Sequence, residues 1–157
     1  MEFRRDDLSG EAIRALLRQH LDSAAQHSPP ESVHALDIDG LRQPGVTFWT
    51  AWSEGELLGC CALKEIDAAH GEVKSMRTVD AHQGRGVGAR LLQHLLAEAR
   101  TRGYRRLSLE TGSADAFAPA RRLYERHGFE YCEPFGDYQP DSWSRFMSLR
   151  LPQAEPS

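Results

Sequence analysis

The sequence predicts an α/β domain built on one mixed β-sheet. Three segments rich in strand-forming residues follow one another through short turns at residues 46–52, 57–65 and 72–79, so we expect them to pair antiparallel. An amphipathic helical pattern separates the third segment from another strand at residues 106–110. Because a strand, a crossover helix and a strand form a parallel unit, the sheet should contain both kinds of pairing.

The remaining segments fit the same fold class. Residues 11–21 carry isoleucine and leucine at helical spacing, whereas residues 34–41 fit either a short helix or a loop. A second amphipathic helix is expected at about residues 118–127. Two final strands are expected at residues 129–132 and 143–149.

Length and composition limit the classes of function. We expect residues 1–151 to form a single domain and residues 152–157 to form a disordered tail. The net charge of −4 gives no global basis for nucleic-acid binding, and no apolar run is long enough to span a membrane. Three cysteines without a Cys-x-x-Cys pattern, and no signal peptide, favour a cytoplasmic protein. Seven scattered histidines predict no metal site.

A glycine-rich turn lies between the third strand and the helix that follows it. Gly84, Gly86 and Gly88 fall within five residues. Glycine lets a ligand approach the backbone closely, and the first amides of a helix have no internal partner. The partial positive charge at the start of a helix also favours an anion. The turn therefore predicts a phosphate-binding site.

The same turn fits the dinucleotide-binding fingerprint G-x-G-x-x-G/A over residues 84–89. Glu110 ends the next strand, where a ribose-binding carboxylate belongs. Against this alternative, the turn does not open the domain, and the strand before it carries the charged residues Glu72, Lys74 and Arg77. An NAD(P)-dependent enzyme nevertheless stays open on these residues alone.

Two motifs resemble those of the GNAT superfamily of N-acetyltransferases. The segment Gln83–Gly88 resembles the Q/R-x-x-G-x-G/A signature, and Ala120–Phe129 resembles the A-x-x-L-Y-x-x-x-G-F element. Their order and separation also agree. The resemblance implies a mixed sheet of six to seven strands with N-terminal antiparallel strands, a splayed parallel pair and helices on both faces.

The resemblance also implies acetyl-CoA as co-substrate. In the family, the glycine turn binds the pyrophosphate through backbone amides, and the preceding strand pairs with the pantetheine arm between two splayed parallel strands. The implied cofactor-binding residues are Met76, Arg77, Thr78, Gln83, Gly84, Arg85, Gly86, Val87, Gly88 and Ala89.

Three residues are candidates for catalysis. Tyr124 matches the family tyrosine that protonates the departing thiolate. Glu72 and Glu110 lie on the strands expected to splay, and either is a candidate general base that acts directly or through water. Phe117 stands where the family often has asparagine, so that side-chain contact to the pantetheine arm is in doubt.

These assignments imply transfer of the acetyl group of acetyl-CoA to a primary amine of a small molecule or peptide, by direct attack in a ternary complex. We expect the acceptor pocket between residues 20–39 and the loop at 135–138, with Arg77, Asp137 and Arg145 as candidates to orient the substrate. A homodimer is compatible with this reading. The alternative is a non-catalytic acyl-CoA sensor that kept the phosphate site and lost the chemistry.

Overall fold

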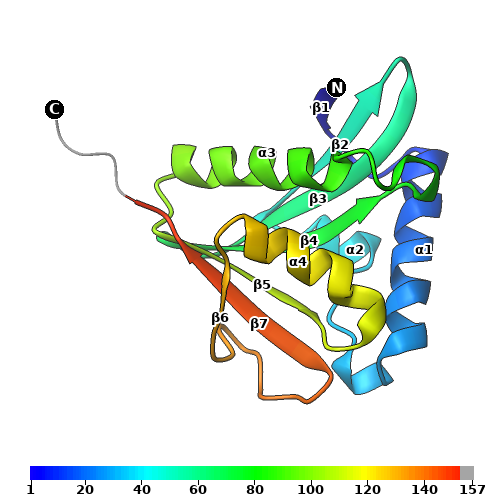
Figure 1. Cartoon of the computed structure of the whole chain (residues 1–157). Helices are drawn as coiled ribbons and strands as arrows, with labels where there is room; N and C mark the ends of the chain where they lie inside the picture. Colours follow the sequence, from blue (N-terminus) through cyan, green and yellow to red (C-terminus); the bar gives the residue numbers. More distant parts are fainter. Residues whose placement is uncertain (153–157) are drawn as a thin grey trace, which may run out of the picture.

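One seven-stranded mixed sheet forms the centre of the protein, seen in a computed structural model that describes residues 1–152 (Figure 1). The strand order is β1-β2-β3-β4-β5-β7-β6, and all neighbours pair antiparallel except β4 and β5, which are parallel. The strands are β1 (Glu2–Arg5), β2 (Val46–Ser53), β3 (Glu56–Asp67), β4 (His70–Thr78), β5 (Arg106–Gly112), β6 (Glu130–Tyr131) and β7 (Ser144–Arg150).

Helices cover both faces of the sheet, as Figure 1 shows. The helices α1 and α2 lie on one face, and α3 and α4 lie on the other. The bounds are α1 (Glu11–His27), α2 (Ile38–Leu41), α3 (Val87–Thr101) and α4 (Ala118–Arg126), with 3₁₀ turns η1 (Pro30–Ser32), η2 (Asp80–His82) and η3 (Asp115–Phe117).

Each face of the sheet has its own apolar core. Leu91, Leu92 and Leu95 of α3 are fully buried on one face, and Ile13 and Leu16 of α1 are buried on the other. Full burial of such a side chain stabilises the fold by roughly 1.5–3 kcal/mol. The two cores hold the helices in place, one pair on each side of the sheet.

The parallel strands β4 and β5 part partway along their length. They pair only from His70 with Arg106 to Glu72 with Ser108, although β4 continues to Thr78 and β5 continues to Gly112. The splayed pair expected from the family resemblance is therefore confirmed. Beyond Glu72, the edge of β4 that faces β5 is free to bond another extended chain.

A bulge bends β4 just beyond this point. Cys60 of β3 pairs with Arg77 and Ala62 pairs with Lys74, so one residue of β3 faces two residues of β4. Ser75, one of those two residues, has a φ of 51°, which is uncommon for a residue other than glycine. The Cys60 thiol donates a hydrogen bond of 3.2 Å to the Ser75 carbonyl. The bulge therefore turns β4 where it leaves its neighbour.

The structure differs from the sequence-based expectations mainly at the ends of the chain. β1 was not expected; it is a four-residue edge strand whose sequence is mostly charged. The strand expected at 129–132 contains only two residues. Residues 34–41 form a loop followed by α2, which begins where the Asp37 carboxylate accepts a 2.8 Å bond from the Gly40 amide. The expected tail lies largely outside the described residues.

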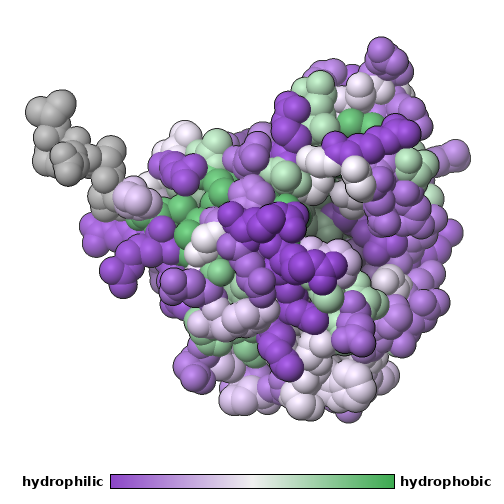
Figure 2. Space-filling model, in the orientation of Figure 1, coloured by the Kyte–Doolittle hydropathy of each residue, from purple (hydrophilic) through white to green (hydrophobic). Residues whose placement is uncertain are grey.

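The face that carries α3 and α4 is mostly hydrophilic, and apolar residues appear on it in small separate areas (Figure 2). No helix within residues 1–152 combines the length and the apolar composition needed to cross a membrane.

Candidate active site

The glycine turn exposes its backbone at the start of α3. Gly84 and Gly86 have φ angles of 78° and 79°, in the left-handed region that favours glycine. Apart from the glycine and its two chain neighbours, no atom within residues 1–152 lies closer than 4 Å to the position that a Cβ would take at either residue. The first helical bond of α3 runs from the Arg90 amide to the Gly86 carbonyl, so the amides before Arg90 have no helical acceptor. An anion can therefore approach this turn directly.

Side-chain contacts hold the residues next to the turn in place. The buried His82 bonds Glu56 at 2.9 Å, and the side-chain amide of Gln83 donates to the Asp80 carboxylate at 3.2 Å. Gly88 faces the Leu123 side chain of α4, where a Cβ would come within 3.2 Å. The turn is thus held by its neighbours while its outer amides stay exposed.

A narrow cavity of about 130 Å³ passes between the parted strands. Residues 73–76 of β4 line one side and residues 110–112 of β5 line the other. Tyr124 of α4 lines it from one face of the sheet, and His20 of α1 lines it from the other. The cavity therefore connects the two faces of the sheet at the place where the strands separate.

Glu110 and Tyr124 both line this cavity. Burial raises the pKa of Glu110 to about 7, against the opposing effects of the Ser144 hydroxyl and the Lys74 ammonium, and the carboxylates of Glu72 and Asp141 add a smaller rise. Burial, and the charge of Glu110, also raise the pKa of Tyr124 above the usual value of a phenol. At neutral pH the cavity thus offers a carboxyl group poised between its two forms and a protonated phenol.

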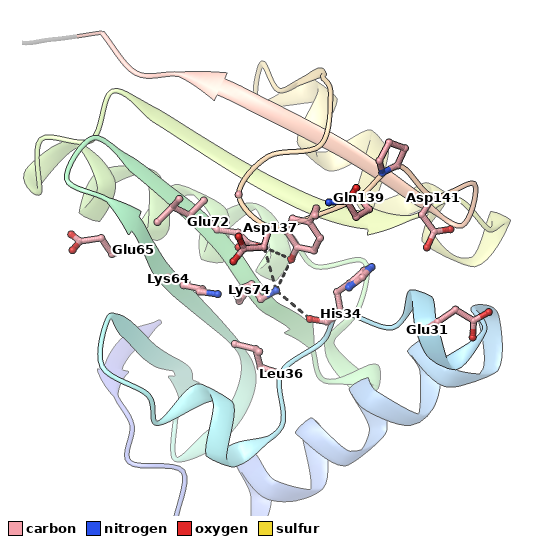
Figure 3. Close-up of a pocket in the computed structure, with 14 residues that line it drawn as sticks. Glu31, His34, Leu36, Lys64, Glu65, Glu72, Lys74, Asp137, Gln139 and Asp141 are labelled. Carbon is pink, nitrogen blue, oxygen red and sulfur yellow. Dashed lines mark hydrogen bonds and ion pairs between the residues drawn. The ribbon is translucent and has the colours of Figure 1, made fainter.

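A larger cavity of about 540 Å³ opens on the α1 and α2 side of the sheet (Figure 3). Its walls come from three segments, namely the connection from α1 to α2, the ends of β3 and β4, and the loop between β6 and β7. Most of the charged groups that line it are acidic. They are Glu31, Glu65, Glu72, Asp137 and Asp141, against Lys64 and Lys74.

A buried ion pair joins those three segments. Lys74 Nζ lies 3.2 Å from Glu72 Oε2 and donates to the Tyr138 hydroxyl at 2.8 Å and to the His34 carbonyl at 3.2 Å. The Tyr138 hydroxyl in turn donates to Glu72 Oε2 at 2.5 Å. All three protons of the ammonium are used. The dashed lines in Figure 3 follow this network between β4 and the two loops.

The structure separates the two candidate bases. Glu72 is 3% exposed and its Oε2 is held by Lys74 and Tyr138. Glu110 lines the same cavity as Tyr124.

His20 lines this cavity from the opposite face of the sheet to Tyr124. Burial, with the charges of Arg77 and Lys74, lowers the pKa of His20 to about 4, so its imidazole is neutral at pH 7.

The structure also places Phe117 and two of the residues expected to orient the substrate, Arg145 and Asp137. The Phe117 ring lies over Gly112, so closely that a Cβ on Gly112 would overlap it, and it lines the narrow cavity. An apolar ring therefore stands at the position where the family often has asparagine. Arg145 donates to the carbonyls of Ser142 and Ser144 and does not line either cavity, whereas Asp137 lines the larger one.

Sequence reasoning missed Lys74 as part of the site, whereas His20 and Tyr138 lie within the two segments expected to border the acceptor pocket but had no role of their own assigned. Lys74 was noted only as a charge that argues against a central parallel strand. The sequence did offer one signal for Lys74. Residues two apart on a strand lie on the same face of the sheet, so Glu72 and Lys74 are expected side by side as a pair of opposite charges. No comparable signal connects Tyr138 or His20 to this strand, because they come from distant segments.

A glycine turn beyond the end of a parted strand, beside a cavity that Glu110 and Tyr124 line, fits the acyltransferase class. The model of the acetyltransferase (GNAT) family matches residues 11–129, and the chain belongs to this family. The chain is 54% identical over 151 residues to an uncharacterized N-acetyltransferase, YsnE, of Bacillus subtilis, covering 96% of this chain and all of that protein. It is 50% identical to an uncharacterized N-acetyltransferase, YedL, of Escherichia coli, covering 93% of this chain and 92% of that protein.

Solved structures agree with this assignment. A crystal structure from Klebsiella pneumoniae, described as an acyl-CoA N-acyltransferase, superposes with a TM-score of 0.76 at 29% sequence identity. The match covers 96% of this chain and 97% of that one. The protein is therefore an acyltransferase of the GNAT fold, and the doubly wound dinucleotide-binding alternative is excluded by its antiparallel first half.

Proposed function

We propose that this enzyme transfers the acetyl group of acetyl-CoA to a primary amine of a small molecule or peptide by direct attack. The observation that carries the proposal is the parting of β4 and β5 after Glu72, directly beside the cavity that contains Glu110 and Tyr124. Family membership supports coenzyme A as the carrier.

The glycine turn is the proposed pyrophosphate site. The amides of residues 84–89 lie at an exposed helix start, where hydrogen bonds to charged groups contribute roughly 1.5–3 kcal/mol each. The free edge of β4 at Met76, Arg77 and Thr78 then offers main-chain groups to the pantetheine arm. A ligand bound in this way brings its thioester toward the narrow cavity.

Glu110 is the proposed general base. The acceptor amine attacks the thioester carbonyl carbon, a C–N bond forms, and the amine loses a proton to Glu110 directly or through water. A carboxyl group with a pKa of about 7 is largely ionised at slightly alkaline pH, and it is basic enough to accept a proton from the attacking amine. Glu72 instead holds the acceptor cavity in shape through Lys74 and Tyr138.

Tyr124 is the proposed general acid. The C–S bond breaks, and the phenol donates its proton to the departing thiolate. From reference values this transfer is uphill by about 1.5 pKa units, or about 2 kcal/mol. Burial raises the pKa of Tyr124, but a thiolate in the same cavity is destabilised in the same way. Burial therefore keeps the phenol protonated, and because it raises the pKa of the thiol as well, it adds less to the cost of the proton transfer than the rise in the Tyr124 pKa alone would.

The larger cavity is the proposed acceptor site. It opens beside Glu72 and Lys74 on the face of the sheet to which Glu110 also belongs, and its lining is mainly acidic. An acidic lining favours amines without a carboxylate, because a negatively charged acceptor would be repelled.

The test is a panel of amines incubated with acetyl-CoA, with detection of free thiol and of the acetylated product. The panel contains diamines, aminoglycosides, amino acids and short peptides. We expect thiol release that depends on at least one amine. Tight binding of acetyl-CoA without release for any amine class would instead favour a non-catalytic acyl-CoA sensor.

A further inference from the structure

Ser75 is buried at the centre of the proposed reaction site without a hydrogen-bond partner for its side chain. It is 7% exposed, and its Oγ bonds no atom within residues 1–152. Buried hydroxyl groups are nearly always bonded, because an unsatisfied one carries its full desolvation penalty. The hydroxyl therefore needs a partner that the chain does not supply.

The backbone at Ser75 is held in an unusual conformation. Its φ of 51° lies in the left-handed region, and the Cys60 thiol fixes its carbonyl at 3.2 Å. Glycine would adopt this conformation without strain. A serine at such a position, inside a bulge and beside a cavity, is typical of strain that is kept for a functional side chain.

The surroundings of Ser75 identify the kind of partner. Ser75 lines the narrow cavity together with Glu110 and Tyr124. In the proposed mechanism Glu110 takes a proton from the amine and Tyr124 gives a proton to the thioester sulfur, so the thioester atom that still needs a partner is the carbonyl oxygen. That oxygen gains negative charge as the amine attacks, and a hydroxyl donor stabilises it.

Two of the other donors that line this cavity are committed elsewhere. Lys74 uses its three protons on Glu72, Tyr138 and the His34 carbonyl, and the Ser32 hydroxyl donates to Asp141. His20 is neutral and belongs to α1, on the opposite face of the sheet to Tyr124. Ser75 has an uncommitted proton on the strand that runs beside the proposed thioester.

We propose that the Ser75 hydroxyl is a catalytic residue that donates a hydrogen bond to the thioester carbonyl oxygen of the bound acyl-CoA. The proposal rests on the proposed function and adds a residue to it. During attack the oxygen becomes an oxyanion that keeps this bond, and on collapse the C=O bond re-forms as the C–S bond breaks. No proton leaves Ser75 in the cycle.

The test compares Ser75→Ala and Ser75→Gly with the wild type and with Ser53→Ala, an exposed serine at the end of β2. Calorimetry gives the Kd values for acetyl-CoA and for CoA, which lacks the carbonyl. We expect both Ser75 variants to reduce the preference for acetyl-CoA by about two- to tenfold and kcat with the fastest amine by about 100- to 1,000-fold. Affinity for CoA should stay within twofold.

Thermal unfolding separates this role from a structural one. Both Ser75 variants remove an unsatisfied buried hydroxyl, and Ser75→Gly also relieves the backbone, so both should unfold at or above the wild-type temperature. Variants that keep wild-type kcat and the wild-type acetyl-CoA preference overturn this inference alone. A wild type that neither binds acetyl-CoA nor transfers its acetyl group overturns the proposed function as well.

Discussion

The Tyr138 hydroxyl donates to Glu72 Oε2 over 2.5 Å, while Lys74 Nζ lies 3.2 Å from the same oxygen. These two contacts join the loop between β6 and β7 to the strand where the sheet opens. Both donors to this oxygen come from the protein itself, so Glu72 Oε2 is already occupied by bonds that join the loop to the strand. The relationship therefore favours Glu110 over Glu72 as the proposed base, and it is consistent with a structural role for Glu72 in the proposed acceptor cavity.

The first prediction concerns this contact. Tyr138→Phe removes a hydroxyl that bonds both Glu72 and Lys74, so the loop above the acceptor cavity should loosen. We expect a loss of about 1–3 kcal/mol in the free energy of unfolding and a KM for the amine raised several-fold. The KM for acetyl-CoA should not change, because Tyr138 lines only the acceptor cavity. Equal increases in both KM values would contradict this assignment.

The pH dependence of the rate tests Glu110. Because the pKa of this carboxyl is raised to about 7, kcat/KM should rise about tenfold per pH unit below pH 7 and level off above it. Glu110→Gln should lower the plateau by about 100-fold or more and remove the inflection near 7. An unchanged inflection in that variant would assign it to another group, and Glu72→Gln is the matched comparison.

The same pKa has a consequence for stability that does not depend on catalysis. The folded state holds the Glu110 proton more tightly than the unfolded state, whose value is about 4.5. Folding is therefore opposed by this group at pH 8, and the opposition decreases as the pH falls through 7 toward 4.5. Glu110→Gln should be more stable than the wild type at pH 8, by on the order of 2 kcal/mol, and the difference should shrink at pH 5. A difference independent of pH would show that Glu110 titrates normally.

Tyr124→Phe tests the proposed acid. The ring stays packed against Phe129, at a centroid distance of 5.8 Å, so the fold should be preserved. We expect kcat to fall by about 100-fold, whereas the Kd for acetyl-CoA should change by less than twofold. Wild-type turnover in this variant would remove Tyr124 from the mechanism and leave it as a core residue.

The glycine turn is tested by a matched pair of substitutions. Gly86→Val places a branched side chain at a φ of 79°, and Gly103→Val places the same side chain at a φ of 78° at the other end of α3. Both positions have open space for a Cβ, so both variants should lose a similar stability of about 1–2 kcal/mol. Only Gly86→Val should weaken acetyl-CoA binding, by about 100-fold or more. Retained affinity in that variant would refute the phosphate site.

The sequence predicted the order of the central elements well because their signals are local. The strands from 46 to 79, the glycine turn and the helix that begins at Val87 each follow from periodicity and turn residues, and the structure has all of them. The four-residue strand β1 carries three charged residues and has no such pattern. It is stabilised by pairing with β2, which no local signal reports.

The site was predictable only as far as its motifs reach. The glycine turn, Glu110 and Tyr124 lie in or near motifs that the sequence displays. The bonds of Lys74 to Tyr138 and to the His34 carbonyl join residues 64 and 40 positions apart, so they depend on the tertiary fold. The buried hydroxyl of Ser75 likewise becomes visible only when the bulge and the cavity are both known.

A crystal structure of the protein with acetyl-CoA tests the central claim most directly. We expect the pyrophosphate on the amides of residues 84–89, the pantetheine arm bonded to the free edge of β4, and the thioester between Glu110 and Tyr124. A ligand bound elsewhere, or β4 and β5 found paired beyond Glu72 with no ligand between them, would contradict the account.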